Sequence, residues 1–506
     1  MLLTLLTSIL DDNPRLYLEY PILLFEGREY TNLQLHRKFC QLGNGLLELG
    51  LQPGDTILVH MENCPEITML YGACIKAGII FCPTLFLISE EELSWIAEHS
   101  EAKYMVTTPN LLPKVRAACP RLFERNAVIL AGMAGEAGTL PMEELYENQP
   151  ESLASSDLSD EDTATILYTS GTTGMPKGAV LTHRNLGSNI RSTASSIRVT
   201  RDEVALSALP LSHSYGLTIS VIPWLCGLTT ILMRWFDAGK IFEETERHHI
   251  RTMTGVPAMF IQLLNHPKAP QFNVRSWKRL QTGAAPCPEE VLKAFREKFG
   301  VHLYEGYGLT EASPIVSAQA PHMEVKYGSV GPPIEGVQVK IRDDFERELP
   351  PGSPGEITVK GPGVMKGYLK DPEETERALR GGWLHTGDIG YIDEAGYLYI
   401  VERKKDLIIT GGFNLYPSEV EKVLERNPAV EEAAVVGEPD PIKGEMVHAF
   451  VTLIEGREIS QDELIAFTRK YLVYYKCPYR VTFLHELPKA YPGKPSRRLL
   501  RERFPR

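Results

Sequence analysis

The sequence is poor in several features, and each shortage excludes a class of protein. No run of eighteen apolar residues occurs, so no transmembrane helix is predicted. The eight cysteines lie scattered, without a Cys-x-x-Cys pair or a His/Cys cluster, which gives no zinc site and suits a reducing cytosol. Positive charge is also scarce, because 53 Lys and Arg face 65 Asp and Glu. The net charge of −12 argues against nucleic acid as the main partner.

Length and composition favour a soluble enzyme. The 506 residues exceed what one hydrophobic core usually supports, so at least two domains are expected. The start, residues 1–7, is apolar but has no basic region and soon meets Asp11 and Asp12, which favours a helix over a signal peptide. The last residues, 503–506, are not a Ser-Lys-Leu type peroxisomal ending. A soluble cytoplasmic protein is the expectation.

The first half of the chain alternates two patterns. Short apolar runs at 56–60 and 127–130 are typical of strands, and the patterns at 66–77 and 91–97 are typical of helices. This alternation predicts an α/β domain of layered sheets. From about 328 to 400, short β-rich runs between Gly/Pro turns predict a small barrel or sandwich-like subdomain.

A charged run at 402–406 is the best candidate for a domain boundary. It lies between two strand-like segments, and a compact α+β pattern follows it. We therefore predict an N-terminal domain over 1–402, a boundary at 403–406 and a small C-terminal α+β domain over 407–506. That this boundary is a hinge and the C-terminal domain mobile is implied only by the family resemblance given below. In that tail, Ser418 with Glu421 and Ser460 with Glu463 each predict a capping box at the start of a helix. The apolar residues after them, including Phe467 and Tyr471, are expected in the core.

The loop after the apolar run 165–167 is the most informative segment. It combines Ser and Thr hydroxyls, glycines that permit close backbone approach, and Lys177. These groups suit phosphate oxygens, although the spacing is not that of the P-loop and the next apolar run, 179–181, favours a strand over a helix. The alternative is a plain polar turn. The residues predicted to bind phosphate are Thr169, Ser170, Gly171, Thr172, Thr173, Gly174 and Lys177.

A second motif, residues 305–311, follows a strand-like run. It offers an aromatic ring to stack on a flat base and, in Glu311, a carboxylate of the kind that Mg²⁺ prefers. A capped Tyr-Gly turn is about as good an interpretation of this motif alone. Together with the loop at 168–178, however, it resembles the signature of the adenylate-forming superfamily, in particular the AMP-forming acyl-CoA synthetases and fatty-acid CoA ligases. Further motifs of that family follow in the same order along nearly the whole chain.

The resemblance implies a role for each matching residue. It implies that the 169–177 loop holds the β,γ-phosphates of ATP and that Glu311 binds magnesium. The other implied nucleotide contacts, to adenine, α-phosphate and ribose, are Tyr307, Gly308, Thr310, Gly283, Ala284, Ala285, Asp388 and Arg403. His213 would lie beside the substrate carboxylate or gate the tunnel for CoA, Lys405 would be the hinge residue, and Gly411 and Gly412 would line that tunnel. Lys494 would stabilise the transition state of adenylation.

Taken singly, most of these motifs can also be interpreted as ordinary structural features that bind no ligand. Gly283 to Ala285 is a small-residue turn, Lys405 belongs to a solvated charge run, and Gly411-Gly412 is a Gly-Gly turn. A lone histidine such as His213 is more often structural. The sequence also departs from the family at Glu402, where glycine or aspartate is common, and at Pro495, where a branched aliphatic residue is usual.

The resemblance implies two half-reactions. A carboxylate first attacks the α-phosphorus of ATP to give an acyl adenylate and pyrophosphate, and the thiol of CoA then displaces AMP. The expected substrate is a medium- or long-chain fatty acid, with ATP, Mg²⁺ and CoA as the other reactants. An aryl- or other carboxylate-CoA ligase, an enzyme that loads a carrier protein, and an inactive nucleotide-binding relative are the alternatives. The oligomeric state, a homodimer included, is left open.

Overall fold

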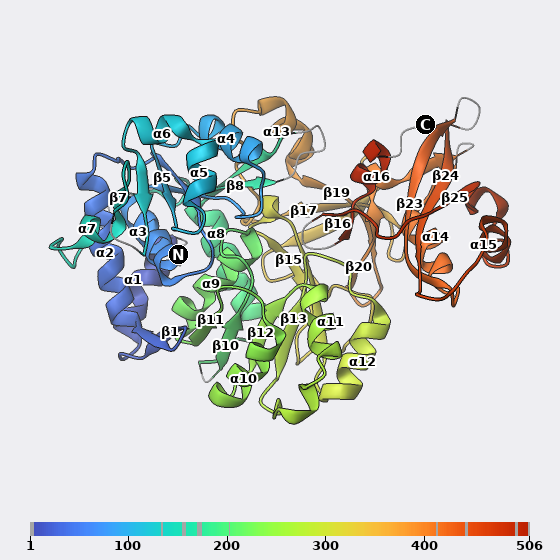
Figure 1. The fold of residues 1–506 in the computed structure, drawn as a ribbon, viewed down its shortest axis with the longest axis horizontal. Coiled ribbons are helices and arrows are strands. Elements are labelled where there is room, and N and C mark those ends of the chain that lie inside the picture. Colours follow the sequence, from blue (N-terminus) through green and yellow to red (C-terminus); the bar gives the residue numbers. More distant parts are fainter. Residues whose placement is uncertain are drawn as a thin grey trace. The chain divides into compact units, whose positions relative to one another are not determined.

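The computed structural model describes residues 5–132, 135–153, 158–169, 175–201, 203–410, 413–440, 444–490 and 494–503. The side chains at 405, 413, 414, 490, 494 and 498 are outside this description. The chain divides into two compact units. The first comprises Met1–Val339 and Val359–His385, and the second comprises Lys340–Thr358 and Thr386–Arg506 (Figure 1). None of the helices in the described ranges is long and apolar enough to span a bilayer.

Two mixed sheets form the framework of the first unit. One has the order β15-β14-β13-β12-β10-β11-β1-β2, and its strands are β1 Pro21–Phe25, β2 Arg28–Thr31, β10 Val204–Ser207, β11 Thr229–Leu232, β12 Thr252–Gly255, β13 Arg279–Thr282, β14 Leu303–Gly308 and β15 Ile315–Ala318. The other has the order β18-β9-β8-β4-β3-β5-β6-β7, and its strands are β3 Thr56–His60, β4 Ile80–Pro83, β5 Tyr104–Thr107, β6 Val128–Leu130, β7 Leu140–Pro141, β8 Thr163–Thr169, β9 Lys177–Thr182 and β18 Gly367–Tyr368. The strands at the centre of each sheet run parallel, as the alternating pattern predicts.

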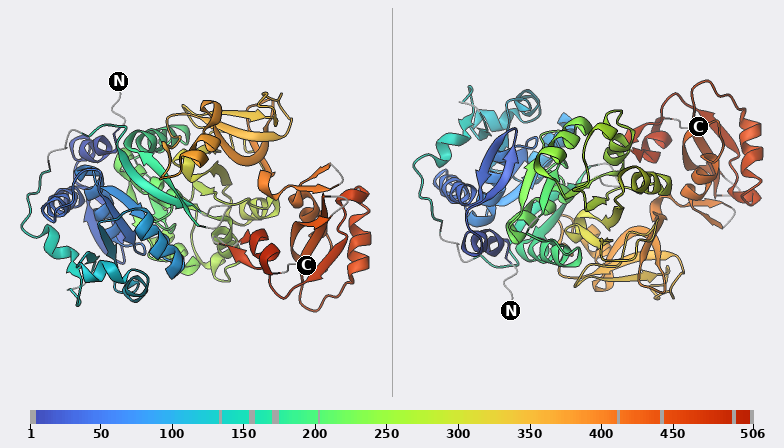
Figure 2. Two further views of the ribbon diagram at one scale, coloured as in Figure 1. Left: turned by 90° about the horizontal axis from the view of Figure 1, so that it is seen from above. Right: turned by 90° about the horizontal axis from the view of Figure 1, so that it is seen from below.

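Helices cover and separate these sheets (Figures 1 and 2). They are α1 Leu6–Leu16, α2 Asn32–Glu48, α3 Pro65–Ala77, α4 Glu90–His99, α5 Leu112–Ala118, α6 Pro120–Glu124, α7 Met142–Tyr146, α8 His183–Ser196, α9 Ser214–Cys226, α10 Ala238–His248, α11 Pro257–Asn265, α12 Glu289–Phe299 and α13 Pro372–Ala378, with short 3₁₀ turns η1 Ala269–Gln271, η2 Thr310–Ala312 and η3 Arg380–Gly382. Helix α8 contacts β9 of one sheet and β15 of the other, so it lies between the layers. Its Asn189 amide donates to the carbonyls of Ala312 and Ile315, which fixes the segment after β14.

The second unit contains part of the predicted β-rich segment, residues 340–358 and 386–400, and the C-terminal tail. Its first sheet has the order β16-β17-β19-β20, with β16 Gln338–Arg342, β17 Gly355–Lys360, β19 Leu384–Ile392 and β20 Leu398–Arg403. After η4 Lys404–Asp406 comes a sheet in the order β22-β21-β24-β23 with β25 beside β24; its strands are β21 Ile408–Thr410, β22 Phe413–Leu415, β23 Val430–Asp440, β24 Gly444–Leu453 and β25 Arg480–Phe483. The other elements are α14 Pro417–Leu424, α15 Gln461–Thr468, η5 Tyr474–Lys476, β26 Lys489–Ala490, β27 Lys494–Pro495 and α16 Arg497–Arg503. The division at residues 403–406 stays a prediction.

The two capping boxes predicted in the tail have opposite outcomes. Ser460 and Glu463 form the predicted reciprocal pair at the start of α15. The box at Ser418 and Glu421 is wrong, because Pro417 already occupies the first turn of α14 and both side chains bond elsewhere. The core assignment is also wrong for Tyr471, which is 55% exposed and lies beyond the end of α15. Phe467 is only half-buried, since α15 packs on the sheet through its neighbours Leu464 and Ile465.

Candidate active site

The predicted site residues of the first unit follow the carboxyl ends of parallel strands. In the first sheet, the chain passes from β10 to β11 on one side and then to β12 on the other, so the strand order reverses beside β10. Open α/β sheets bind ligands outside the carboxyl ends of strands at such a switch point. His213 follows β10, Gly283 follows β13, and Tyr307 and Gly308 end β14. Topology therefore places these sequence motifs at one edge of the sheet.

The phosphate loop is held at both ends by a strand pair. Strands β8 and β9 are antiparallel, and Thr169 pairs with Lys177 at the end of their register. This confirms the prediction that the run after the loop is a strand and not a helix. Residues Ser170 to Gly174, which are predicted to bind phosphate, lie outside the described residues.

Glu311 contacts hydroxyl oxygens from two segments that are far from it in the sequence. The Tyr368 hydroxyl donates to Glu311 Oε1 at 2.9 Å, and the Thr169 hydroxyl lies 3.5 Å from the same oxygen. Strand β18, which carries Tyr368, pairs with β9 and thereby reaches the base of the phosphate loop. Burial and the neighbouring Glu311 raise the pKa of Tyr368, so its phenol keeps its proton. A hydroxyl and a carboxylate are oxygen donors of the type that Mg²⁺ takes, so Thr169 and Glu311 fit that ion.

Lys177 has an internal counter-ion. Its Nζ lies 3.0 Å from Glu374 Oε1, and only 16% of the lysine side chain is exposed. Glu374 is on the first turn of α13, where the Asp371 side chain accepts from its backbone N–H. The lysine also lies over the ring of Tyr368, 5.7 Å from its centroid. Thus α13 and β18 bring Glu374 and Tyr368 to Lys177, at the described end of the loop that is predicted to bind phosphate.

His213 begins helix α9 and is held in a single tautomer. Its Nδ1 accepts from the backbone N–H of Tyr215 at 3.2 Å, as a helix cap. Burial lowers the pKa of His213 to about 4, so the imidazole is neutral near pH 7. Because Nδ1 is an acceptor, the proton of the neutral ring is on Nε2. The next residue, Ser214, hydrogen bonds to Thr310 with 3.1 Å between their hydroxyl oxygens, which ties the start of α9 to the Glu311 segment.

Backbone packing fixes the segments predicted to contact the base. Gly283 lies against Tyr215 and the carbonyl of Gly306, each 3.3 Å from where a Cβ would stand. Ala284 has a φ of 61°, a conformation that costs energy for a residue with a side chain. At Gly308 a Cβ would stand 2.1 Å from the carbonyl oxygen of Pro314, so only glycine fits there.

Glu305 is a buried acid two residues before Tyr307. The residue is 6% exposed, and its Oε2 has no hydrogen-bond partner among the described residues. Burial raises the pKa of Glu305 to about 7, against the opposing effect of the backbone N–H groups of Gly328 and Cys287. The carboxyl therefore titrates near neutral pH. It is in β14, two residues before Tyr307, the predicted adenine contact.

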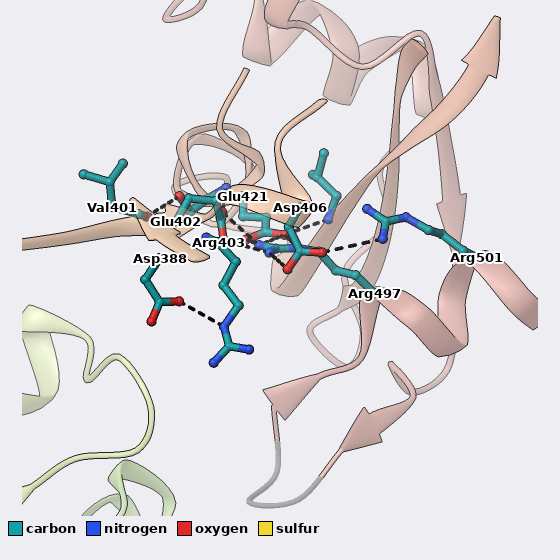
Figure 3. A network of polar contacts seen from close by, with 10 residues as sticks. Asp388, Val401, Glu402, Arg403, Asp406, Glu421, Arg497 and Arg501 are labelled. Carbon is teal, nitrogen blue, oxygen red and sulfur yellow. Dashed lines mark hydrogen bonds and ion pairs between the residues drawn. The ribbon is translucent and has the colours of Figure 1, made fainter. Parts of the chain in front are cut away.

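Asp388 and Arg403 meet in the second unit (Figure 3). They face each other in the antiparallel register of β19 and β20, and Arg403 Nε lies 3.2 Å from Asp388 Oδ1. The Asp388 side chain is 8% exposed, whereas that of Arg403 is 61% exposed. A carboxylate held by an arginine is suited to accept hydrogen bonds from two neighbouring hydroxyls.

The remaining predicted residues are described only in part. Lys405 lies in η4 and Lys494 in β27, where it pairs with Ala490, but the side chains of both lysines are outside the described residues. Gly411 and Gly412 are outside them altogether. Sequence reasoning missed Tyr368 and Glu374, because neither belongs to a motif and only the pairing of β18 with β9 brings them to the loop.

Known proteins share both the sequence and the fold. The model of the AMP-binding enzyme family matches residues 10–369, and that of the AMP-binding enzyme C-terminal domain matches residues 419–494. The chain is 36% identical to a feruloyl-CoA synthase of Amycolatopsis sp, with 94% of each chain covered, and 35% identical to a long-chain-fatty-acid–CoA ligase of Bacillus subtilis, with 98% of this chain and 94% of the relative covered.

A solved structure of a related protein matches the fold of the whole chain. The crystal structure of ATP-bound MatB from Rhodopseudomonas palustris superposes with a TM-score of 0.90 at 32% identity, covering 99% of this chain and 98% of that one. The matches span nearly the full length of both partners, and they include the segments that carry the described contacts. The chain is therefore a member of the AMP-binding enzyme family and an AMP-forming acid–thiol ligase that uses ATP and CoA.

Proposed function

We propose that this ligase activates a monocarboxylic acid with an apolar body, and that its substrate is a medium- or long-chain fatty acid. The observation that carries the proposal is the apolar cluster beside His213. It comprises the buried side chains of Ile197, Leu209, Tyr215, Val256, Met259, Ile315, Ala318, Ala320 and Ile334. Tyr215 of this cluster is in helix α9, whose N-terminal cap is His213, a histidine that is neutral near pH 7. Apolar side chains of this kind suit the hydrocarbon chain of a fatty acid.

The chemistry proposed for His213 follows from its tautomer. With Nδ1 occupied by the Tyr215 amide, Nε2–H is a donor that a substrate carboxylate can accept from. A neutral donor orients the carboxylate without neutralising it, so the oxygen keeps its nucleophilic charge. Since the pKa of His213 is about 4, this arrangement holds across the physiological pH range.

Adenylation needs alignment and positive charge but no nucleophile from the protein. We assign Lys177 and the 169–174 loop to the β,γ-phosphates, Thr310 to the α-phosphate and Tyr307 to adenine. Magnesium, when bound at Glu311, supplies charge to the phosphoryl oxygens. Lys494 adds an ammonium group in this step only, while Asp388 and Arg403 hold the ribose. The proposed effect of these groups is electrostatic stabilisation of the transition state.

Thioester formation is assigned to a second arrangement of the C-terminal residues. We propose that residues 407–506 rotate about Lys405, which withdraws Lys494 and lets Gly411 and Gly412 line the path of the CoA thiol. Glycine suits that path because a narrow channel needs backbone without side chains. A soluble, cytoplasmic location is part of the same proposal.

The test is a substrate panel with wild-type enzyme. Mg²⁺-ATP, CoA and either saturated acids of increasing chain length or hydroxycinnamic and other aromatic acids are assayed for pyrophosphate release and CoA consumption. We expect the highest kcat/KM for a medium- or long-chain fatty acid. A higher kcat/KM for an aromatic acid would support the alternative of an aryl-CoA ligase, which the similarity to feruloyl-CoA synthase favours.

Tyr215 offers a matched pair of variants for the acid pocket. Its ring is 8% exposed and lies against Gly283, so Tyr215→Ala removes a wall of the apolar cluster. We expect this variant to shift kcat/KM toward bulkier acids, and Tyr215→Phe, which keeps the ring, to retain the wild-type order. An unchanged order in Tyr215→Ala would contradict the pocket assignment.

A further inference from the structure

A buried ionic cluster surrounds Arg497, the first residue of α16 (Figure 3). Its guanidinium contacts Glu402 in β20, Asp406 in η4 and Glu421 in α14. Each of these four side chains is at most 17% exposed. Charged groups are rarely buried to this extent unless each has a partner. The cluster lies entirely within the second unit.

The guanidinium uses all three of its nitrogens. Nη1 and Nη2 donate to the two oxygens of Glu402 at 2.9 and 3.2 Å. Nη2 donates to Glu421 Oε2 at 2.8 Å, Nε donates to Oε1 of the same carboxylate at 3.2 Å, and Nη1 lies 3.3 Å from Asp406 Oδ2. Only arginine has a planar fork that can bind two carboxylates in this way.

The carboxylates are anchored separately from the arginine. Glu402 Oε2 accepts from the backbone N–H of Ser418 at 3.0 Å, and Glu421 Oε1 accepts from that of Val435 at 2.7 Å. Arg501, one turn further along α16, lies 3.5 Å from Asp406. Glu402 is therefore joined to α14 through the Ser418 amide as well as through Arg497, and Arg497 is the group that joins these carboxylates to α16.

The residues of this cluster lie on both sides of the proposed hinge along the chain. Glu402 precedes Lys405, the proposed hinge residue, whereas Asp406 and Glu421 follow it. Arg497 comes three residues after Lys494. A rotation about Lys405 displaces Glu402 relative to every residue after the hinge, so the contacts of Glu402 with Arg497 and with the Ser418 amide must both open. The contacts of Arg497 with Asp406 and Glu421 can travel with the rotating part.

We propose that Arg497 is a positioning residue for Lys494, and that its contact with Glu402 is a latch that favours the adenylate-forming arrangement. While the latch is closed, the start of α16, three residues after Lys494, is held to β20, the strand whose Arg403 pairs with Asp388. The proposed function needs Lys494 at the nucleotide in the first half-reaction only, so we assign the closed contact to that arrangement. Opening the latch frees the segment for the second half-reaction. This inference rests on the proposed two-arrangement mechanism.

The experiment compares two chemically identical changes on opposite arms of Arg497. Glu402→Gln weakens the arm that must open, and Glu421→Gln weakens the arm that does not. Adenylation is measured as pyrophosphate release from acid and Mg²⁺-ATP. Thioester formation is measured separately, from synthetic acyl adenylate and CoA. Thermal unfolding of each variant verifies that it is folded at the assay temperature.

We expect Glu402→Gln to slow adenylation by about 5- to 150-fold, the usual range for a coupling between two conformational states. Thioester formation from the synthetic adenylate should stay within about twofold of wild type or become faster. Glu421→Gln should leave the ratio of the two rates at its wild-type value. The proposal is overturned if Glu402→Gln lowers both rates in equal proportion or changes neither, or if Glu421→Gln shifts the ratio by the same factor.

Two further variants keep the test informative if Glu402→Gln folds poorly. Glu402→Asp keeps the charge but shortens the reach, and should give the same shift of the ratio to a smaller extent. In Arg497→Lys, which keeps a cation without the fork, the added change Glu402→Gln should have little further effect on adenylation. Additive losses would refute the latch. A wild-type enzyme that adenylates no acid would refute the proposed function instead, so the two failures are distinguishable.

Discussion

Glu305 should make the stability of the first unit depend on pH in the direction opposite to most carboxylates. The unfolded chain releases this proton near pH 4.5, whereas burial raises the folded-state pKa to about 7. Between these values the unfolded state binds fewer protons than the folded one, so the free energy of unfolding falls as the pH rises. Below pH 4.5 and above pH 7 the contribution is constant.

The magnitude follows from the two pKa values. A difference of one pKa unit corresponds to about 1.4 kcal/mol, so full ionisation of Glu305 costs about 3 kcal/mol of stability. Glu305→Gln, which has the same shape and no charge, should match wild type near pH 5 and exceed it by up to about 3 kcal/mol at pH 8. The absence of a hydrogen-bond partner for Oε2 supports the substitution, because no acceptor contact is lost there.

The assay is urea unfolding of wild type and Glu305→Gln at pH 5, 6, 7 and 8. The signal should be the fluorescence of Trp277, buried in the core that packs on β13 and β14, with the remaining tryptophans replaced. The difference between the two proteins should grow with pH and level off above about pH 7. A difference that is constant over this range would refute the burial argument.

Three other changes test single residues of the site. Lys494→Ala should cripple adenylation but spare thioester formation from synthetic acyl adenylate; equal loss in both assays would contradict its assignment. Glu311→Gln should raise the Mg²⁺ concentration for half-maximal adenylation by about 10-fold or more, because a neutral amide is a poorer ligand, and an unchanged Mg²⁺ dependence would remove Glu311 from the metal site. Gly308→Ala places a methyl group about 2.1 Å from the Pro314 carbonyl and should lower the free energy of unfolding by about 1–3 kcal/mol, measured by urea unfolding; a stable, fully active variant would show that this loop can move.

Local sequence signals predicted the elements well where no distant charge competes. The capping box at Ser460 and Glu463 depends on residues three apart, and it forms as predicted. The same pattern at Ser418 and Glu421 fails because Pro417 starts the helix one residue earlier, and because Arg497, 76 residues away from Glu421, binds that carboxylate. The proline is a local signal against this box, whereas the arginine comes from the end of the chain and has no signal in the local pattern.

In the candidate site, too, residues that belong to a motif were predicted, and residues brought in only by strand pairing were not. Asp388 and Arg403 were predicted from a resemblance, and the register of β19 and β20 explains why two residues fifteen apart belong together. Tyr368 and Glu374 had no signal in the sequence, since a tyrosine before a loop and a glutamate at a helix start are ordinary features. Their place in the site depends on which strand β18 joins, and that is a property of the whole sheet.

The pairing of Lys177 with Glu374 has a consequence for turnover. A lysine that already has a partner gains less from an incoming polyphosphate than a bare cation would, because one favourable contact is exchanged for another. The same exchange runs in reverse when the leaving pyrophosphate departs, since the glutamate can reclaim the lysine. We therefore expect this residue pair to trade some affinity for nucleotide against faster product escape.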